Sequence, residues 1–170
     1  MKRRTLVLAG AGATAAAAGV AWRLRPGAGP EMAPAGFWDL RFERPEGGEL
    51  ALASLRGRPL LLNFWATWCA PCIKEMPDLD RFQQTYGSQG WQVVGLAIDG
   101  PTPVREFLKK LPVRFAIGLA GLDGTDLARQ LGNEQGGLPF TVIFDREGRI
   151  SGRKLGQTRW PELEAWAQAV

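Results

Sequence analysis

Histidine is absent from this 170-residue chain, and cysteine occurs only twice. Without histidine, neither a Ser-His nor a Cys-His catalytic pair can form. Two thiols alone would leave a tetrahedral zinc site half empty, so a zinc site of cysteine and histidine is excluded as well. Covalent haem attachment needs histidine directly after the second cysteine, where this chain has Ile73. We therefore expect no metal site.

Acidic residues are missing from the start of the chain. Five basic residues and no acidic one precede Pro26. Without those five, the 21 basic residues fall to 16, which face 17 acidic ones, so the formal net charge of +4 comes from the N-terminus. The rest of the chain is close to neutral and has no nucleic-acid signature. We expect no nucleic-acid partner.

An uncharged run from Thr5 to Trp22 follows the basic Lys2-Arg3-Arg4. This is the layout of an export signal, and Arg3-Arg4 loosely resembles a twin-arginine signal. Alanine and glycine dominate residues 5–22, which would make a weak membrane span. Three alternatives stay open for residues 1–22: a cleaved signal, a retained anchor or a disordered tail. The first two predict a periplasmic or other extracytoplasmic domain, held at the inner membrane if the leader is retained.

The pattern of the remaining residues predicts a flexible linker and one domain. Residues 23–36 contain three prolines and several glycines, so the linker is placed there and the domain at 37–170. Segments 37–42 and 49–52 flank a turn and predict a β-hairpin. Strands are expected at 60–65, 91–98, 115–119, 140–144 and 149–155, and helices at 71–86, 104–110, 126–131 and from Trp160. This order predicts an α/β fold with a mixed sheet.

Both cysteines, Cys69 and Cys72, lie between a predicted buried strand and a predicted helix. Two thiols at C-x-x-C spacing in this position can open and close a disulfide, which predicts thiol–disulfide exchange. The N-terminus of the helix stabilises an anion, so we expect a lowered pKa for Cys69 and assign it the attack on a partner's disulfide. Pro71 suits the first helical turn, where its missing N–H has no intrahelical partner. Cys72 is expected to resolve the mixed disulfide.

Two other interpretations of the cysteine pair are a permanent structural staple and two inert buried thiols. Closing so short a loop removes only about 2 kcal/mol of chain entropy, which argues against a staple. A cysteine at a helix N-terminus after a turn is usually reachable, which argues against inert thiols. We therefore favour a redox-active disulfide.

Two motifs carry a family resemblance. The first reads Asn63-Phe64-Trp65-Ala66-Thr67-Trp68-Cys69-Ala70-Pro71-Cys72, followed by Glu75-Met76-Pro77. It resembles the exported TlpA/ResA-type thiol–disulfide oxidoreductases of the thioredoxin superfamily. Residues 137–148 resemble the second signature of the same family. The likeness spans about residues 37–170 and implies a thioredoxin fold, a mixed central sheet flanked by helices, with an added N-terminal β-hairpin.

The resemblance also implies where a partner binds. Pro139 would be cis and face the cysteines, whereas from the residues alone it could equally be an ordinary strand-entry proline. The backbone of Leu138 would pair with an extended partner segment. We assign partner binding to Trp68, Pro71, Leu138 and Pro139.

Glu75 lies one helical turn beyond Cys72, on the same helix face. Asn63 stands where cytoplasmic thioredoxins have a buried aspartate that moves protons, and an amide cannot do this. We expect Glu75 to act in its place, and a surface acid that favours the helix dipole is the alternative. A carboxylate near a thiol disfavours the thiolate, which predicts a reductase rather than an oxidase.

By resemblance, the partners are protein disulfide substrates, for example in cytochrome c maturation or copper-site assembly, and a membrane dithiol electron donor. We expect a monomer without a cofactor. A thiol peroxidase of the peroxiredoxin type would need threonine or serine three residues before its reactive cysteine and proline seven before. Ala66 and Leu62 stand there relative to Cys69. A copper(I) carrier could use two thiolates, but no Met-x-Met or histidine cluster assists.

Overall fold

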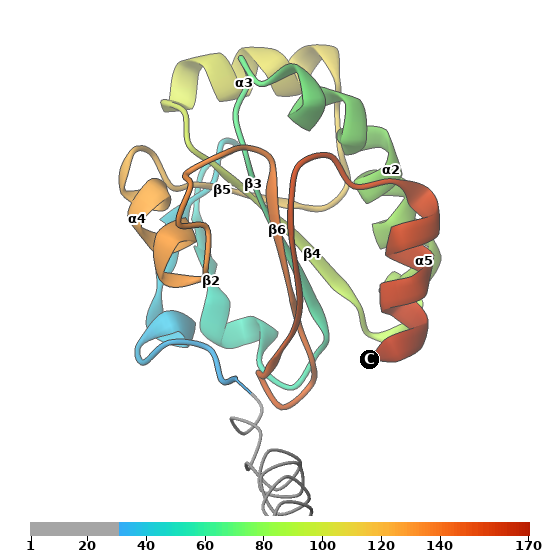
Figure 1. Cartoon of the computed structure of the whole chain (residues 1–170). Helices are drawn as coiled ribbons and strands as arrows, with labels where there is room; N and C mark the ends of the chain where they lie inside the picture. The colour runs from blue at the N-terminus through green and yellow to red at the C-terminus, as the bar shows by residue number, and fades with distance from the viewer. Residues whose placement is uncertain (1–30) are drawn as a thin grey trace, which may run out of the picture.

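The computed structural model describes residues 31–170, so the leader predicted at 1–22 and linker residues 23–30 lie outside the described residues. Seven strands form one sheet in the order β2-β1-β5-β4-β3-β6-β7 (Figure 1). They are β1 (Arg41–Glu43), β2 (Glu49–Ala51), β3 (Leu60–Trp65), β4 (Gln92–Ala97), β5 (Ala116–Leu119), β6 (Phe140–Phe144) and β7 (Ile150–Leu155). Strands β3, β4 and β5 are parallel, and the other pairs are antiparallel. The predicted mixed sheet is confirmed.

Strand β3 is an interior strand of the sheet, and every one of its side chains is buried. It pairs with β4 on one side and with β6 on the other. A strand that is covered on both faces has a continuous run of apolar residues in its sequence. Residues 60–65 form such a run, with Asn63 as the one exception. The single polar residue in this run therefore needs a local explanation.

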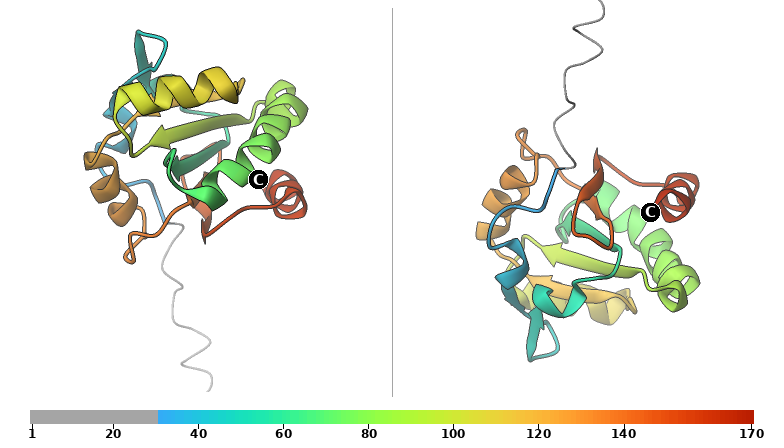
Figure 2. Two further views of the ribbon diagram at one scale, coloured as in Figure 1. Left: turned by 90° about the horizontal axis from the view of Figure 1, so that it is seen from above. Right: turned by 90° about the horizontal axis from the view of Figure 1, so that it is seen from below.

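Helices cover both faces of the sheet. Helices α2 (Ala70–Tyr86), α3 (Pro101–Lys110) and α5 (Trp160–Ala169) pack on one face, through a cluster that includes Leu61, Trp65 and Ile143. Helix α4 (Asp123–Gln130) packs on the other face with the short 3-10 helices η1 (Phe37–Asp39) and η2 (Leu52–Leu55). Figure 2 shows α4 across the sheet from the other three. A third 3-10 turn, η3 (Gly87–Gln89), follows α2. The α/β class with flanking helices is confirmed.

The predicted N-terminal hairpin is present as β1 and β2, with Arg41 opposite Ala51. Its first residues differ from the prediction, because Phe37–Asp39 form a 3-10 turn rather than strand. Phe37 and Trp38 are both buried, whereas neighbouring residues of a strand point to opposite faces. The turn allows both rings to pack against Phe144, with ring centroids 4.8 Å and 5.8 Å away.

Residues 31–36, the described end of the expected linker, lie against the turn between β6 and β7. The N–H of Ile150 donates to the carbonyl of Glu31 over 2.7 Å, and that of Ala33 to Gly148 over 3.0 Å. Met32 pairs with Arg149 in an isolated bridge. The described folded unit thus includes residues ahead of the boundary suggested at Phe37. Among residues 31–170, none of the helices has both the length and the apolar character of a membrane span.

Candidate active site

The two cysteines form a disulfide at the start of α2, directly after the loop that follows β3. Their Cα atoms are 5.3 Å apart. Cys69 is the N-cap of α2, and its Sγ accepts a hydrogen bond from the backbone N–H of Cys72 over 3.3 Å. Cys69 is 6% exposed and Cys72 is 0% exposed. Both cysteines are thus buried in the disulfide form, and the small exposure that remains belongs to Cys69, the outer of the two.

The loop before Cys69 is held by Asp99, a residue that the sequence analysis did not single out. The N–H of Thr67 donates to Oδ2 of Asp99 over 2.5 Å, and the N–H of Cys69 donates to the carbonyl of Ala66 over 3.2 Å. Asp99 follows β4 just as Thr67 follows β3. Because adjacent parallel strands end at the same edge of a sheet, an acid directly after the neighbouring strand was a usable signal.

The Leu138–Pro139 peptide bond is cis, which confirms the isomer that the resemblance implied. It precedes β6, whose first residue, Phe140, is paired with Phe64 near the end of β3. This register brings the cis bond to the edge of the sheet where Cys69 lies. The carbonyl of Pro139 accepts a hydrogen bond from the N–H of Gly156 over 2.8 Å, which ties this segment to the loop after β7.

A groove of about 540 Å³ is lined by Trp68, the residue before Cys69, and by Leu138, the residue before the cis proline, while neither cysteine is part of its lining. Two of its apolar side chains are unusually exposed, Trp68 at 70% and Leu122 at 83%. The groove thus combines two of the four residues that we assigned to partner binding. The other two lie outside its lining, since Pro71 is exposed on the first turn of α2 and Pro139 is buried.

Glu75 is fully buried, and its carboxylate is surrounded by donors. Oε1 accepts from Nδ2 of Asn63 over 2.7 Å. Oε2 accepts from the N–H and from Oγ1 of Thr158, over 2.6 Å and 2.8 Å. Burial raises the pKa of Glu75 above its ordinary value of 4.5, and the hydrogen bonds from Thr158 and Asn63 offset part of this effect. The carboxyl group is therefore placed to hold or release a proton inside the protein.

The hydrogen bonds of Asn63 explain why a polar residue is found in the buried strand β3. Its Nδ2 donates to Glu75 and also to Oγ1 of Thr141 over 3.1 Å, while its Oδ1 is buried without a partner among the described residues. Thr141 lies directly opposite Asn63 in the pairing of β3 with β6. Neither threonine was predicted from the sequence to take part in the site. A strand register could have indicated Thr141, but Thr158 is in a loop 83 residues beyond Glu75 and gave no local signal.

Comparisons with known proteins agree with this arrangement. The chain matches the Redoxin family over residues 10–169. It is 30% identical over 126 residues to a thiol-disulfide oxidoreductase ResA of Bacillus cereus, an alignment covering 74% of this chain and 70% of that protein.

Solved structures give the same result. A putative thiol:disulfide interchange protein DsbE from Chlorobium tepidum is similar with a TM-score of 0.69 and 28% identity, over 82% of this chain and 92% of that one. The structure of MTB dsbF is similar with a TM-score of 0.68 and 27% identity, over 81% and 98%. With its C-x-x-C disulfide in a thioredoxin fold, the chain belongs to the Redoxin family and is a thiol–disulfide oxidoreductase of the TlpA/ResA type.

Proposed function

We propose that this chain reduces protein disulfides outside the cytoplasm, with Cys69 as the attacking sulfur and Cys72 as the resolving one. The observation that supports this most is the asymmetry of the pair. Cys69 is the N-cap of α2, where the helix favours an anion, and it directly follows Trp68 of the groove, while Cys72 is fully covered. A partner's disulfide can approach the first sulfur only.

The cycle starts from the dithiol. The Cys69 thiolate attacks one sulfur of a partner's disulfide, a mixed disulfide forms, and the partner's second sulfur leaves as a thiolate that takes up a proton. The Cys72 thiol then loses its proton and attacks Sγ of Cys69. The partner's first sulfur leaves, and two electrons have moved to the partner while the 69–72 disulfide closes. A dithiol donor must reduce this disulfide again.

Glu75 is proposed to accept the proton that Cys72 loses. It lies one turn beyond Cys72 on α2, is buried, and its raised pKa brings the carboxyl closer to neutral pH, where proton transfer is most effective. When ionised, the same carboxylate disfavours a Cys72 thiolate. It therefore stabilises the disulfide relative to the dithiolate, which suits a reductant more than an oxidant.

The partner is proposed to bind as an extended segment beside Leu138. Residues 31–170 form no hydrogen bond with the backbone of Leu138, so its polar groups are available for strand addition. Trp68 supplies apolar contact in the groove, and Pro139 and Pro71 shape the two chain segments on either side of the disulfide. Binding of this kind uses the backbone and apolar surface of the partner, which suits protein substrates in general.

Location and electron supply complete the proposal. Residues 1–22 are proposed as an export signal or an inner-membrane anchor, residues 23–30 as the linker, and a membrane dithiol protein as the electron donor. Cell fractionation with N-terminal sequencing of the mature protein tests the leader. An unprocessed chain in the cytoplasmic fraction would contradict export.

The direction of the reaction is tested by the redox potential of the 69–72 pair. We expect a potential close to the reducing end of the range, near the value of about −270 mV typical of thioredoxin. The purified protein should also accelerate insulin reduction by a dithiol, and Cys69→Ser should not. A potential near about −120 mV would assign the chain to the oxidases instead.

A further inference from the structure

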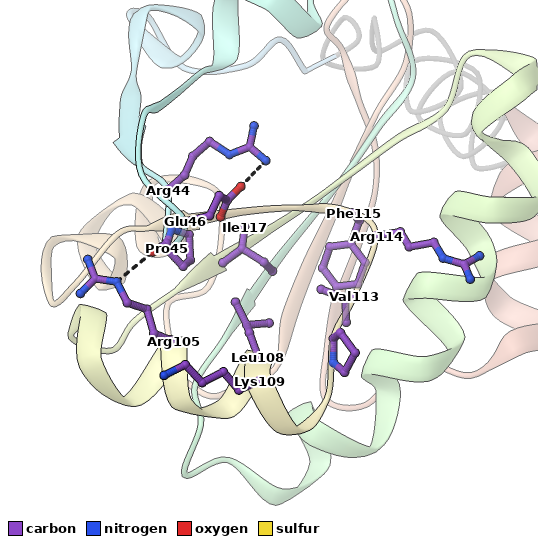
Figure 3. A pocket seen from close by; sticks show the side chains of 11 residues that line it. Arg44, Pro45, Glu46, Arg105, Leu108, Lys109, Val113, Arg114, Phe115 and Ile117 are labelled. Atoms are coloured by element: carbon purple, nitrogen blue, oxygen red, sulfur yellow. Dashed lines mark hydrogen bonds and ion pairs between the residues drawn. The ribbon is translucent and has the colours of Figure 1, made fainter.

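A second hollow, of about 440 Å³, lies between the turn after β1 and the second half of α3 (Figure 3). We call it the α3 pocket. It shares no lining residue with the groove beside the disulfide. Its floor is apolar and consists of Leu108, Val113, Phe115 and Ile117. Leu108 and Val113 are half-buried, so part of this apolar surface is open to solvent.

Four basic residues line the pocket around this floor. They are Arg44 from the hairpin turn, Arg105 and Lys109 from α3, and Arg114 from the loop after α3. In Figure 3 the side chain of Arg114 extends outward from the floor toward α2. The one acid of the lining, Glu46, is ion-paired with Arg44. Within residues 31–170 the other three bases form no ion pair. The pocket therefore has an excess of three positive charges, on a chain whose residues after Pro26 hold 16 bases against 17 acids.

The arrangement of the charges indicates the kind of anion. Arg105 donates from Nε to the carbonyl of Pro45 over 2.8 Å, Lys109 lies one turn further along the same helix face, and Arg114 lies beyond the end of the helix. These groups come from separate places around the floor. A single phosphate or carboxylate would need donors that converge on one point. Charges spread around an apolar centre fit a chain with several carboxylates around apolar side chains.

The N-terminal segment of this chain is not a suitable occupant. It has five basic residues and no acidic one before Pro26, so the rim would repel it. We propose that the α3 pocket binds an acidic segment of a partner protein, in which apolar side chains are flanked by aspartate or glutamate. The floor stabilises the complex by apolar burial, and the rim charges steer and select the partner.

This site is separate from the disulfide chemistry and does not depend on it. A partner held at the α3 pocket leaves Cys69 and the groove free. When one partner reaches both, the second contact becomes intramolecular and raises the effective concentration of its disulfide at the groove. The groove alone distinguishes poorly among partners, because it contacts only backbone and apolar surface. The α3 pocket would therefore add selection among them.

Two synthetic hexapeptide amides test the proposal. Each has a central leucine and phenylalanine, flanked on both sides by two glutamates in one peptide and by two lysines in the other. They are titrated into the ¹⁵N-labelled oxidised protein. We expect the acidic peptide alone to shift the amide signals of residues 105–111, 113, 114, 44 and 46, the two prolines of these segments having no amide N–H. Raising the salt from about 0.05 M to 0.5 M should weaken its binding about tenfold, because the rim charges are exposed.

Matched variants sharpen the test. Lys109→Glu with Arg114→Glu should weaken acidic-peptide binding at least about tenfold, by replacing attraction with repulsion. Lys110→Glu makes one such charge reversal on an exposed neighbour outside the lining and should alter binding less than about twofold, whereas Lys109→Glu alone should still weaken it severalfold. Val113→Thr keeps the shape of a floor side chain but makes it polar, and should weaken binding severalfold. Thermal unfolding and reduction of a small disulfide verify that each variant is folded and active.

Several results would overturn the proposal. They are equal binding of the lysine peptide, undiminished binding by the double variant, and signal shifts confined to the groove. Binding of vesicles of anionic phospholipid without binding of the acidic peptide would assign the surface to lipid and would overturn it equally. Because small-disulfide reduction is measured separately, loss of the proposed reductase function cannot be confused with loss of this site.

Discussion

The two sides of the disulfide differ in almost every physical respect. The inner side is a buried polar network of Asn63, Glu75, Thr141 and Thr158, drawn from α2, two strands and a loop. The outer side is an open groove with Trp68 at its edge. This contrast supports the division of work that we propose, in which the inner side takes up the proton of Cys72 and the outer side binds the partner. Changes on the inner side should alter stability and pH dependence, and changes on the outer side should alter partner use.

The largest effect is expected from the sulfurs themselves. Cys69→Ser should reduce disulfide reduction to background, because the remaining cysteine, Cys72, is fully covered. Cys72→Ser should still attack a partner but should remain joined to it, because the mixed disulfide cannot be resolved. Mass spectrometry after non-reducing electrophoresis checks both variants. Accumulation of mixed disulfides by Cys69→Ser instead would reverse the assigned roles.

Glu75→Gln tests the inner side. It should slow resolution by Cys72 at least about tenfold, through loss of the proton acceptor, in a stopped-flow assay of mixed-disulfide decay. The unpartnered Oδ1 of Asn63 can accept from the new amide after a flip, so the fold should persist. Unchanged resolution at all pH values would remove Glu75 from the mechanism.

The pH dependence of stability gives Glu75 a second test. Because its pKa is raised in the folded protein, the folded state binds this proton more tightly than the unfolded state does. The free energy of unfolding should therefore fall as the pH rises from the ordinary value of 4.5 through the raised pKa, by about 1.4 kcal/mol for each unit of difference. Urea titrations should show this decline in the native chain and not in Glu75→Gln. Parallel curves for the two proteins would contradict it.

Thr158→Val should have a smaller effect on the same network. It keeps the shape of the side chain and the backbone N–H contact but removes the hydrogen bond from Oγ1 to the Glu75 carboxylate, now 2.8 Å long. We expect a loss of about 1–3 kcal/mol in the free energy of unfolding and a further rise in the pKa of Glu75. Thr158→Ser retains the hydroxyl and should restore most of both. If serine is no better than valine, the hydroxyl does not support the carboxylate.

Trp68→Ala should have the smallest effect on stability of these substitutions and should alter only the reaction with protein partners. The side chain is 70% exposed, so the free energy of unfolding should change by less than about 0.5 kcal/mol. The ratio kcat/KM for insulin should fall severalfold, while that for a small disulfide should stay unchanged. Met32→Ala removes an exposed apolar side chain far from the disulfide and is the control. An equal loss with both substrates would place Trp68 in the chemistry.

Local sequence patterns predicted most of the fold. The strand from Leu60 to Trp65 and the helix after Cys69 were clear because apolar runs and a capping position are local signals. The 3-10 turn at Phe37 was missed, since only packing against Phe144 distinguishes it from a strand. Helical periodicity predicted that Glu75 lies on the same helix face as Cys72. It did not predict that Glu75 is buried or that it contacts Thr158. Contacts between residues far apart in sequence, including those of the α3 pocket, needed the folded structure.

The different roles of the two sulfurs can be tested by alkylation of the native protein after mild reduction, with peptide mass spectrometry to locate the label. We expect rapid labelling of Cys69 and protection of Cys72, with protection lost on unfolding. Labelling of Cys72 first, or of neither sulfur, would contradict the assignment of an outer attacking sulfur and an inner resolving one.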